Sequence, residues 1–139
     1  MSQTFYFGRL IDHVHLRVRD LQASKRFYRA ALGAPGRQPT SESDTHINFD
    51  ELWIDAADEG GPSRVHLAFQ AADHDAVRRF YEAALGAGGR DNGAPGERTY
   101  HPGYFACFVL DPDGHNVEAV HHGPAKRSAD AVHVKRAEE

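Results

Sequence analysis

The sequence contains a single cysteine, Cys107, so no disulfide can form within the chain. This usage fits a reducing compartment, and we expect a cytoplasmic location. No stretch approaches the roughly 20 apolar residues of a membrane span, and the N-terminal residues have no apolar signal-like core. Lys and Arg are scattered and the net charge is −4, which argues against a nucleic-acid partner.

Histidine is what the sequence has in excess, with ten among 139 residues. Because imidazole is a common metal ligand and titrates near neutral pH, the position of each histidine matters. Hydrophobic residues make up 40% and charged residues 26%, which is typical of a soluble globular protein. We expect one domain over residues 1–123 and a flexible tail over residues 124–139.

An internal repeat organises the chain. Residues 25–37, KRFYRAALGAPGR, recur at 78–90 as RRFYEAALGAGGR, a shift of 53 residues. Comparing residues 13–37 with their counterparts at this shift gives 13 identities in 25 positions, where chance gives roughly two. The same shift pairs His13 with His66.

Each copy predicts a strand followed by a helix, with Asp20 or Asp73 as N-cap and Gly33 or Gly86 at the C′ position just beyond the helix. Further strands follow in THINF, ELWIDAA, GYFACFVL and NVEAVHH, and an irregular one is expected in RQPTSES or RDNGAPGERTY. The fold class is therefore α+β, with two βαβββ modules. We place these modules at about residues 10–60 and 63–123.

Apolar residues of each first strand are expected to pack under the helix, so His13 and His66 face the opposite, concave side. Glu118 lies in the last strand of the second module, in DPDGHNVEAV. Two imidazoles and a carboxylate form a facial metal-ligand set with open positions. The sequence therefore predicts a divalent metal on His13, His66 and Glu118, with Fe²⁺, Mn²⁺, Zn²⁺, Ni²⁺ and Co²⁺ all left open.

Three motifs resemble the vicinal oxygen chelate superfamily, also called the glyoxalase, bleomycin resistance and dioxygenase superfamily. They are HVHLRVRDLQASKRFY from His13, RVHLAF around His66 and DPDGHNVE ending at Glu118, and the similarity spans about residues 10–122. The resemblance implies paired modules around a half-barrel cleft that holds the metal. It also implies a homodimer, in which modules pair within one chain or between two chains.

The segment RTYHPGYFACFVLDPDGHNVEAV resembles extradiol dioxygenases, which implies an acid–base role for His101. Cys107 and Phe108 stand where that motif has an apolar–tyrosine pair, and Tyr104 is the candidate for the missing hydroxyl. We therefore favour a dioxygenase-like enzyme acting on a small oxygenated substrate. The expected substrate contacts are His15, Trp53 and Tyr100.

Two alternatives stay open. A glyoxalase I-like lyase or a thiol transferase is one, although the second glutamate of glyoxalase I has no clear match among the acids of DELWIDAA. The other is a metal-free protein that sequesters a planar antibiotic against its aromatic residues. The remaining histidines are read as surface residues, with His121 undecided: His46, His74, His115, His122 and His133.

Overall fold

A computed structural model describes residues 8–133 and 135–137. The first half contains β1 (Val14–Val18), α1 (Leu21–Gly33), β2 (Ser41–Ser43), β3 (His46–Phe49) and β4 (Leu52–Ala56). The second half contains β5 (His66–Gln70), α2 (His74–Gly86), β6 (Arg90–Glu97), β7 (Phe105–Leu110) and β8 (Asn116–His121). The βαβββ order predicted for each half is confirmed, and β2 and β6 lie in the two irregular segments.

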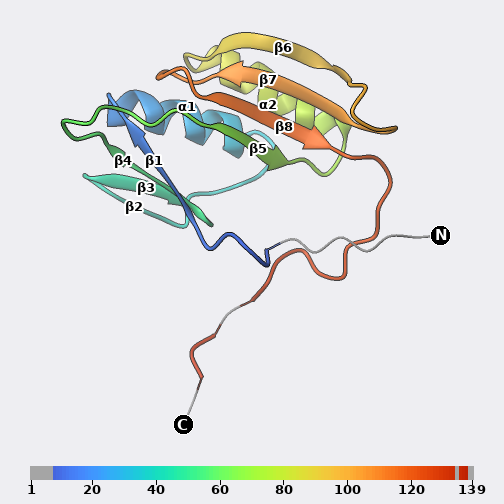
Figure 1. Ribbon diagram of the computed structural model, residues 1–139, viewed down its shortest axis with the longest axis horizontal. Helices are drawn as coiled ribbons and strands as arrows, with labels where there is room; N and C mark the ends of the chain where they lie inside the picture. The colour runs from blue at the N-terminus through green and yellow to red at the C-terminus, as the bar shows by residue number, and fades with distance from the viewer. Residues whose placement is uncertain (1–7, 134, 138–139) are drawn as a thin grey trace.

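Each half forms its own four-stranded sheet, with strand order β1-β4-β3-β2 in the first and β5-β8-β7-β6 in the second. The pairs β1–β4 and β5–β8 are parallel, and the other pairs are antiparallel. Figure 1 shows the first sheet at the lower left and the second at the upper right. The two open sheets, with their two helices, form the predicted α+β architecture.

The strand β6 is irregular because of its glycines. Its pairing with β7 shifts register on both sides of Gly93, whose φ of 152° favours glycine. A Cβ at Gly93 would also come within 2.9 Å of the Phe108 ring. This bulged strand has no alternating pattern of apolar residues, which explains why its limits could not be read from the sequence.

Both helices begin where the sequence predicts. The Asp20 carboxylate accepts from Ala23 N at 3.1 Å, and the Asp73 carboxylate accepts from Ala76 N at 2.7 Å. The predicted C′ positions are wrong, because Gly33 and Gly86 are the last helical residues and the C-caps are Ala34 and Ala87. Each helix has 13 residues, and neither described helix is long and apolar enough to cross a membrane.

The core lies between the sheets and the helices, which also pack against each other. It contains the apolar faces of both modules and the Cys107 thiol, which is fully buried. Burial raises the pKa of Cys107 to about 11, so this thiol is not a reactive thiolate. Lys25 is an unexpected member of the buried set, and its Nζ donates to Ser43 O at 2.6 Å.

The C-terminal segment leaves the second sheet after β8 and runs away from the body of the molecule (Figure 1). Residues 124–133 and 135–137 contain no helix or strand. Arg127 ties this segment back to β5 through a hydrogen bond to Gln70 Oε1, and it also donates to Asp130 O within the segment. Flexibility of the tail stays a prediction.

Candidate functional site

His66 and Glu118 lie on the open face of the second sheet. Their strands are adjacent and parallel, with Ala68 opposite Glu118 and His66 two residues before Ala68. Because alternate residues of a strand share a face, the two side chains meet, and His66 Nε2 lies 2.8 Å from Glu118 Oε1. The Glu118 side chain is 2% exposed and that of His66 is 52% exposed. A buried carboxylate therefore faces an imidazole that solvent can reach.

Tyr104 binds the other oxygen of the same carboxylate. It directly precedes β7, the neighbour of β8, and its hydroxyl donates to Glu118 Oε2. Burial raises the pKa of Tyr104 well above its usual value, and the hydrogen bond to Glu118 adds to this effect. The phenol therefore stays protonated near neutral pH and holds Glu118 in one orientation.

A pair of histidines lies next to Tyr104. His101 Nε2 is 2.9 Å from His122 Nδ1, and the centroids of the two rings are 5.1 Å apart. The Tyr104 ring packs edge-on against both, at centroid distances of 5.3 and 5.1 Å. Burial, followed by the neighbouring His101, lowers the pKa of His122, so His122 favours its neutral form. We refer to His66, His101, Tyr104, Glu118 and His122 as the second-module cluster.

The open face of the first sheet carries different chemistry. His15 Nε2 lies 2.6 Å from Asp55 Oδ1, and Trp53 Nε1 donates to Asp55 Oδ2 at 3.3 Å. The His46 ring stacks on the Trp53 indole with centroids 4.0 Å apart and the planes 2° from parallel. His46 was predicted to be a surface residue, but this stack leaves it half-buried. We refer to His15, His46, Trp53 and Asp55 as the first-module face.

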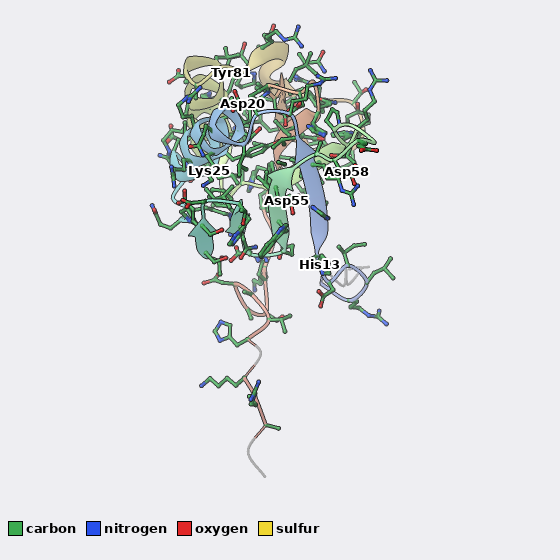
Figure 2. The ribbon with its side chains drawn as sticks, turned by 90° about the vertical axis from the view of Figure 1, so that its left-hand side faces the viewer. His13, Asp20, Lys25, Asp55, Asp58 and Tyr81 are labelled. Atoms are coloured by element: carbon green, nitrogen blue, oxygen red, sulfur yellow. The ribbon has the colours of Figure 1, made fainter. Side chains whose placement is uncertain are left out.

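His13 lies beside the first-module face, directly before β1. Figure 2 shows it at the N-terminal end of that strand. Its Nδ1 is 2.7 Å from Asp12 Oδ1, and it lines a hollow of about 400 Å³ with His15, Asn48, Asp50 and Trp53. In the described part of the chain, His13, His66 and Glu118 do not form a group with ligand atoms within 4.8 Å of one another. One chain thus assembles two of the three predicted ligands.

The sheet register identifies the first-module residue that stands in the place of Glu118. His15 is paired with Trp53 across β1 and β4, just as Ala68 is paired with Glu118 across β5 and β8. Ala68 is the repeat equivalent of His15, so Trp53 takes the position of the carboxylate. An indole is not a metal ligand, and the acids within residues 51–55 lie at other register positions.

The tight turn between β7 and β8 contains a group of possible metal ligands that the sequence did not indicate. His115 is 1% exposed, so the prediction of a surface residue is wrong. Asp111, Asp113 and His115 are the one described group of three whose potential ligand atoms lie within 4.8 Å of one another. Both ring nitrogens of His115 are already hydrogen-bonded, to Asp111 Oδ2 and Ser63 Oγ, each at 2.8 Å. A metal here would have to break these bonds.

Tyr100, the remaining predicted substrate contact, lies beside Tyr104. Two further histidines, His74 and His121, lie in and near α2. Tyr100 is 70% exposed and its ring lies 4.9 Å from that of Tyr104. His74 is exposed, as predicted, and stacks on Phe105 at 3.9 Å. The undecided His121 is half-buried, with its Nδ1 3.1 Å from Ala71 O.

Comparison with known proteins identifies the family and the fold of this chain. The profile of the Glyoxalase/Bleomycin resistance protein/Dioxygenase superfamily matches residues 10–119. A search of curated proteins gives no match. Among solved structures, a glyoxalase/bleomycin resistance protein from Albidiferax ferrireducens is 26% identical, with a TM-score of 0.71 over 81% of this chain and 98% of the other.

Two further structures share the fold. A glyoxalase-related enzyme from Fulvimarina pelagi is 23% identical, with a TM-score of 0.63 over 87% of this chain and 99% of the other. A glyoxalase/bleomycin resistance protein/dioxygenase family enzyme from Burkholderia phytofirmans is 21% identical, with a TM-score of 0.62 over 80% of this chain and 97% of the other. These likenesses establish the two-module fold predicted from the repeat.

Proposed function

This chain belongs to the Glyoxalase/Bleomycin resistance protein/Dioxygenase superfamily, and from that premise we propose that it is a metal-dependent enzyme acting on a small substrate with neighbouring oxygen atoms. Members of the superfamily typically bind divalent metals. The observation that carries the proposal is the contact between His66 and Glu118, 2.8 Å apart on the open face of the second sheet.

The chemistry of this donor pair fits a divalent metal. One ligand is a buried carboxylate and the other an accessible imidazole, a combination that suits Fe²⁺, Mn²⁺, Zn²⁺, Ni²⁺ and Co²⁺. Among the described residues, Glu118 has His66 as its one ion-pair partner, so no Lys or Arg competes for the carboxylate. Tyr104 supplies the hydrogen bond that commonly orients a ligating carboxylate.

We propose that a second copy of the chain completes the ligand set with its His13. In one chain His13 lies at the hollow of the first-module face, apart from the second-module cluster. A homodimer that places the first-module face of one subunit against the second-module cluster of the other would bring the three ligands together. Such a cleft would also place His15 and Trp53 where a substrate could contact them.

A bound divalent metal would chelate two substrate oxygens and polarise them as a Lewis acid. Within the chain, Tyr104 keeps Glu118 in place, and His101 is positioned beside Tyr104 to accept or donate a proton. His122 bonds the Nε2 of His101 and so restrains that ring. We assign His101 as the acid–base residue and Tyr104, whose ring packs edge-on against it, as the hydroxyl that supports the site.

Among metal-dependent reactions, we favour dioxygenase-like chemistry over a glyoxalase I-like isomerisation. The reason is that Trp53 occupies the first-module position equivalent to Glu118, so the fourth ligand of the glyoxalase I pattern is not supplied there. Three protein ligands leave more coordination positions for substrate and oxygen. A thiol transferase would use the same three ligands. Because only the dioxygenase reaction consumes oxygen, an oxygen-uptake assay distinguishes the two.

Metal analysis is the first test. Protein purified without chelator should contain about one metal ion per chain, and His66→Ala should lose it. His133→Ala is the matched control, because this exposed histidine lies in the C-terminal segment. Retention of the full metal content by His66→Ala would place the metal elsewhere.

Oxygen uptake tests the reaction. Protein loaded with Fe²⁺ should consume oxygen with at least one member of a catechol panel, and His101→Ala should lower the rate by about 100-fold or more. No uptake with any catechol would reject the dioxygenase reaction while leaving the metal site to the previous test. Equal uptake by the variant would remove His101 from the mechanism.

A second candidate function is metal-free binding of a planar aromatic compound. The observation favouring it is Trp53, which lines a hollow of about 400 Å³ and is stacked on His46. Because Trp53 is the single tryptophan, its fluorescence reports on this face directly. Quenching by a planar drug that is unchanged by EDTA would favour this function over the metal-dependent one.

A further inference from the structure

A chain of hydrogen bonds runs from a buried aspartate to a half-buried serine between the two modules. Ser63 lies in the segment that joins β4 to β5, and its Oγ is 2.8 Å from His115 Nε2. On the other side of the ring, His115 Nδ1 is 2.8 Å from Asp111 Oδ2. A serine, a histidine and an aspartate are therefore connected through the two nitrogens of one imidazole, which is the arrangement of a hydrolase triad.

The hydrogen bonds around Asp111 determine which nitrogen of His115 donates and which can accept a proton. Asp111 Oδ1 accepts from the backbone nitrogens of Asp113 and His115 at 2.9 Å, and Oδ2 accepts from Tyr28 Oη at 2.6 Å. Burial raises the pKa of Asp111, but the hydrogen bonds from His115 and Tyr28 outweigh it and hold the pKa below its usual value. An ionised Asp111 can only accept, so His115 donates to it from Nδ1, and a neutral His115 then turns its Nε2 lone pair towards Ser63.

Ser63 itself is held in place at the edge of the molecule. Its backbone nitrogen donates to Arg17 O at 3.1 Å, and its Oγ accepts from Arg17 N at 3.1 Å. The residue is half-buried, whereas the side chains of His115 and Asp111 are 0% exposed. The hydroxyl accepts from Arg17 N and has two acceptors for its hydrogen, His115 Nε2 at 2.8 Å and Arg17 O at the longer distance of 3.3 Å. Donation to His115 leaves one lone pair of Oγ for an electrophile.

We propose that Ser63 is a nucleophile of a second chemical site, with His115 as its general base and Asp111 as the carboxylate that orients the base. The substrates are small activated esters or other acyl donors that reach the half-buried hydroxyl. Nothing in this site uses His66, Glu118 or a metal, so the proposal is independent of the proposed function.

The proposed reaction is transfer of an acyl group to Ser63 followed by its hydrolysis. Ser63 Oγ forms a bond to the acyl carbon while its proton moves to His115 Nε2, and the bond to the leaving alcohol breaks as that alcohol takes the proton from Nε2. Water then attacks the acyl group, gives one proton to Nε2 and releases the acid, and the proton returns to Ser63. Acyl group, water and protons balance without an oxidant or a cofactor.

The first-module face contains a natural comparison. His46 also contacts two serines, with its Nε2 3.0 Å from Ser41 Oγ and its Nδ1 2.7 Å from Ser43 Oγ. No described carboxylate bonds this ring. If an aspartate behind the imidazole activates Ser63, these two serines should stay unreactive in the same molecule.

The test uses a fluorophosphonate probe, which releases fluoride when a serine oxygen attacks its phosphorus. Folded protein in EDTA is treated with the probe, digested and mapped by mass spectrometry, with urea-unfolded protein as the reference. We expect labelling at Ser63 in folded protein only, and none at Ser41 or Ser43. An unlabelled Ser63, or equal labelling of all three serines, would overturn the proposal.

Variants assign the roles. Ser63→Ala should abolish labelling, and Ser41→Ala should leave its rate unchanged. His115→Gln should slow labelling by about 100-fold, the usual scale of general-base catalysis. Circular dichroism checks that each variant is folded. If His115→Gln is unfolded, the comparison of Ser63 with Ser41 and Ser43 within folded wild-type protein still decides the outcome. Undiminished labelling of a folded His115→Gln would remove His115 as the base.

Discussion

The open face of the first sheet presents an indole where the open face of the second sheet presents a carboxylate. Trp53 and Glu118 occupy the same place in the register of their sheets, next to His15 and Ala68 respectively. Around Trp53 the partners are aromatic and hydrogen-bonded, whereas Glu118 is buried between an imidazole and a phenol. The two modules thus keep the same backbone but carry different chemistry: an indole stacked on an imidazole in the first, and a buried carboxylate beside an imidazole in the second.

The turns that precede β4 and β8 differ in the same way. In the second module, Asp111 is buried and joins Tyr28 of α1 to His115, so it connects the two modules. In the first module, Asp50 is exposed and its carboxylate makes only long contacts, at 3.4 Å to Thr40 and 3.5 Å to Arg37. Equivalent turns therefore contribute unequally to stability.

The largest expected effect is on folding. Asp111→Asn should lower the free energy of unfolding by about 3 kcal/mol, because a buried ionised acceptor is replaced by an amide that leaves donors unpaired. Asp50→Asn should change it by less than about 0.5 kcal/mol, since the residue is exposed and Asn tolerates its positive φ. Urea unfolding measures both, and equal losses would show that the two turns are equivalent.

The second effect is on metal binding. Glu118→Gln should weaken the affinity by about 100-fold or more, because it removes a ligand, and even a residue supporting a ligand is worth 10–100-fold. Asp55→Asn, the matched change on the first-module face, should leave the affinity unchanged. Calorimetric titration with Zn²⁺ or Co²⁺ compares them. Weakening by Asp55→Asn to the same degree would mean that the first module also ligates the metal.

A smaller effect is expected at Tyr104. Tyr104→Phe should weaken metal binding by about 10-fold, because the hydroxyl that orients Glu118 is lost. Tyr100→Phe is the control, since that exposed phenol packs its ring on Tyr104. Identical affinities for wild type and Tyr104→Phe would show that Glu118 needs no such support.

The smallest effect is on acid stability. The pKa of Asp111 is lower in the folded protein than in the unfolded chain, where a carboxyl titrates near pH 4. Its stabilisation is therefore complete above about pH 4 and is lost as the pH falls through the folded-state pKa. Urea unfolding at pH 7 and pH 3 should show a smaller loss for Asp111→Asn than for wild type. Equal losses would place the acid-sensitive group elsewhere.

Local signals predicted the fold well. The repeat, the two N-caps and the alternation of the central strands depend on residues close in sequence, so the βαβββ order could be read directly. The helix ends and β6 were harder, because Gly33 and Gly86 are compatible with one more helical residue and the glycines of β6 remove its pattern.

The candidate site was predictable only in part. His66 and Glu118 follow from the repeat and from the terminal motif, and the structure brings them together. The burial of His115 depends on Ser63 from the connecting segment and on Asp111, which in turn bonds Tyr28 of the other module. Such contacts join residues far apart in the chain, and no periodicity in the sequence records them.

The central claim is that the unlike faces of two subunits form one metal site, and mixed dimers test it most directly. Differently tagged His13→Ala and Glu118→Gln chains are coexpressed, and the dimer carrying both tags is isolated for metal analysis. If each site combines His13 of one subunit with Glu118 of the other, the mixed dimer has one intact site and should contain about one metal ion, while either variant alone contains none. A mixed dimer without metal, or a chain that stays monomeric, would contradict the account.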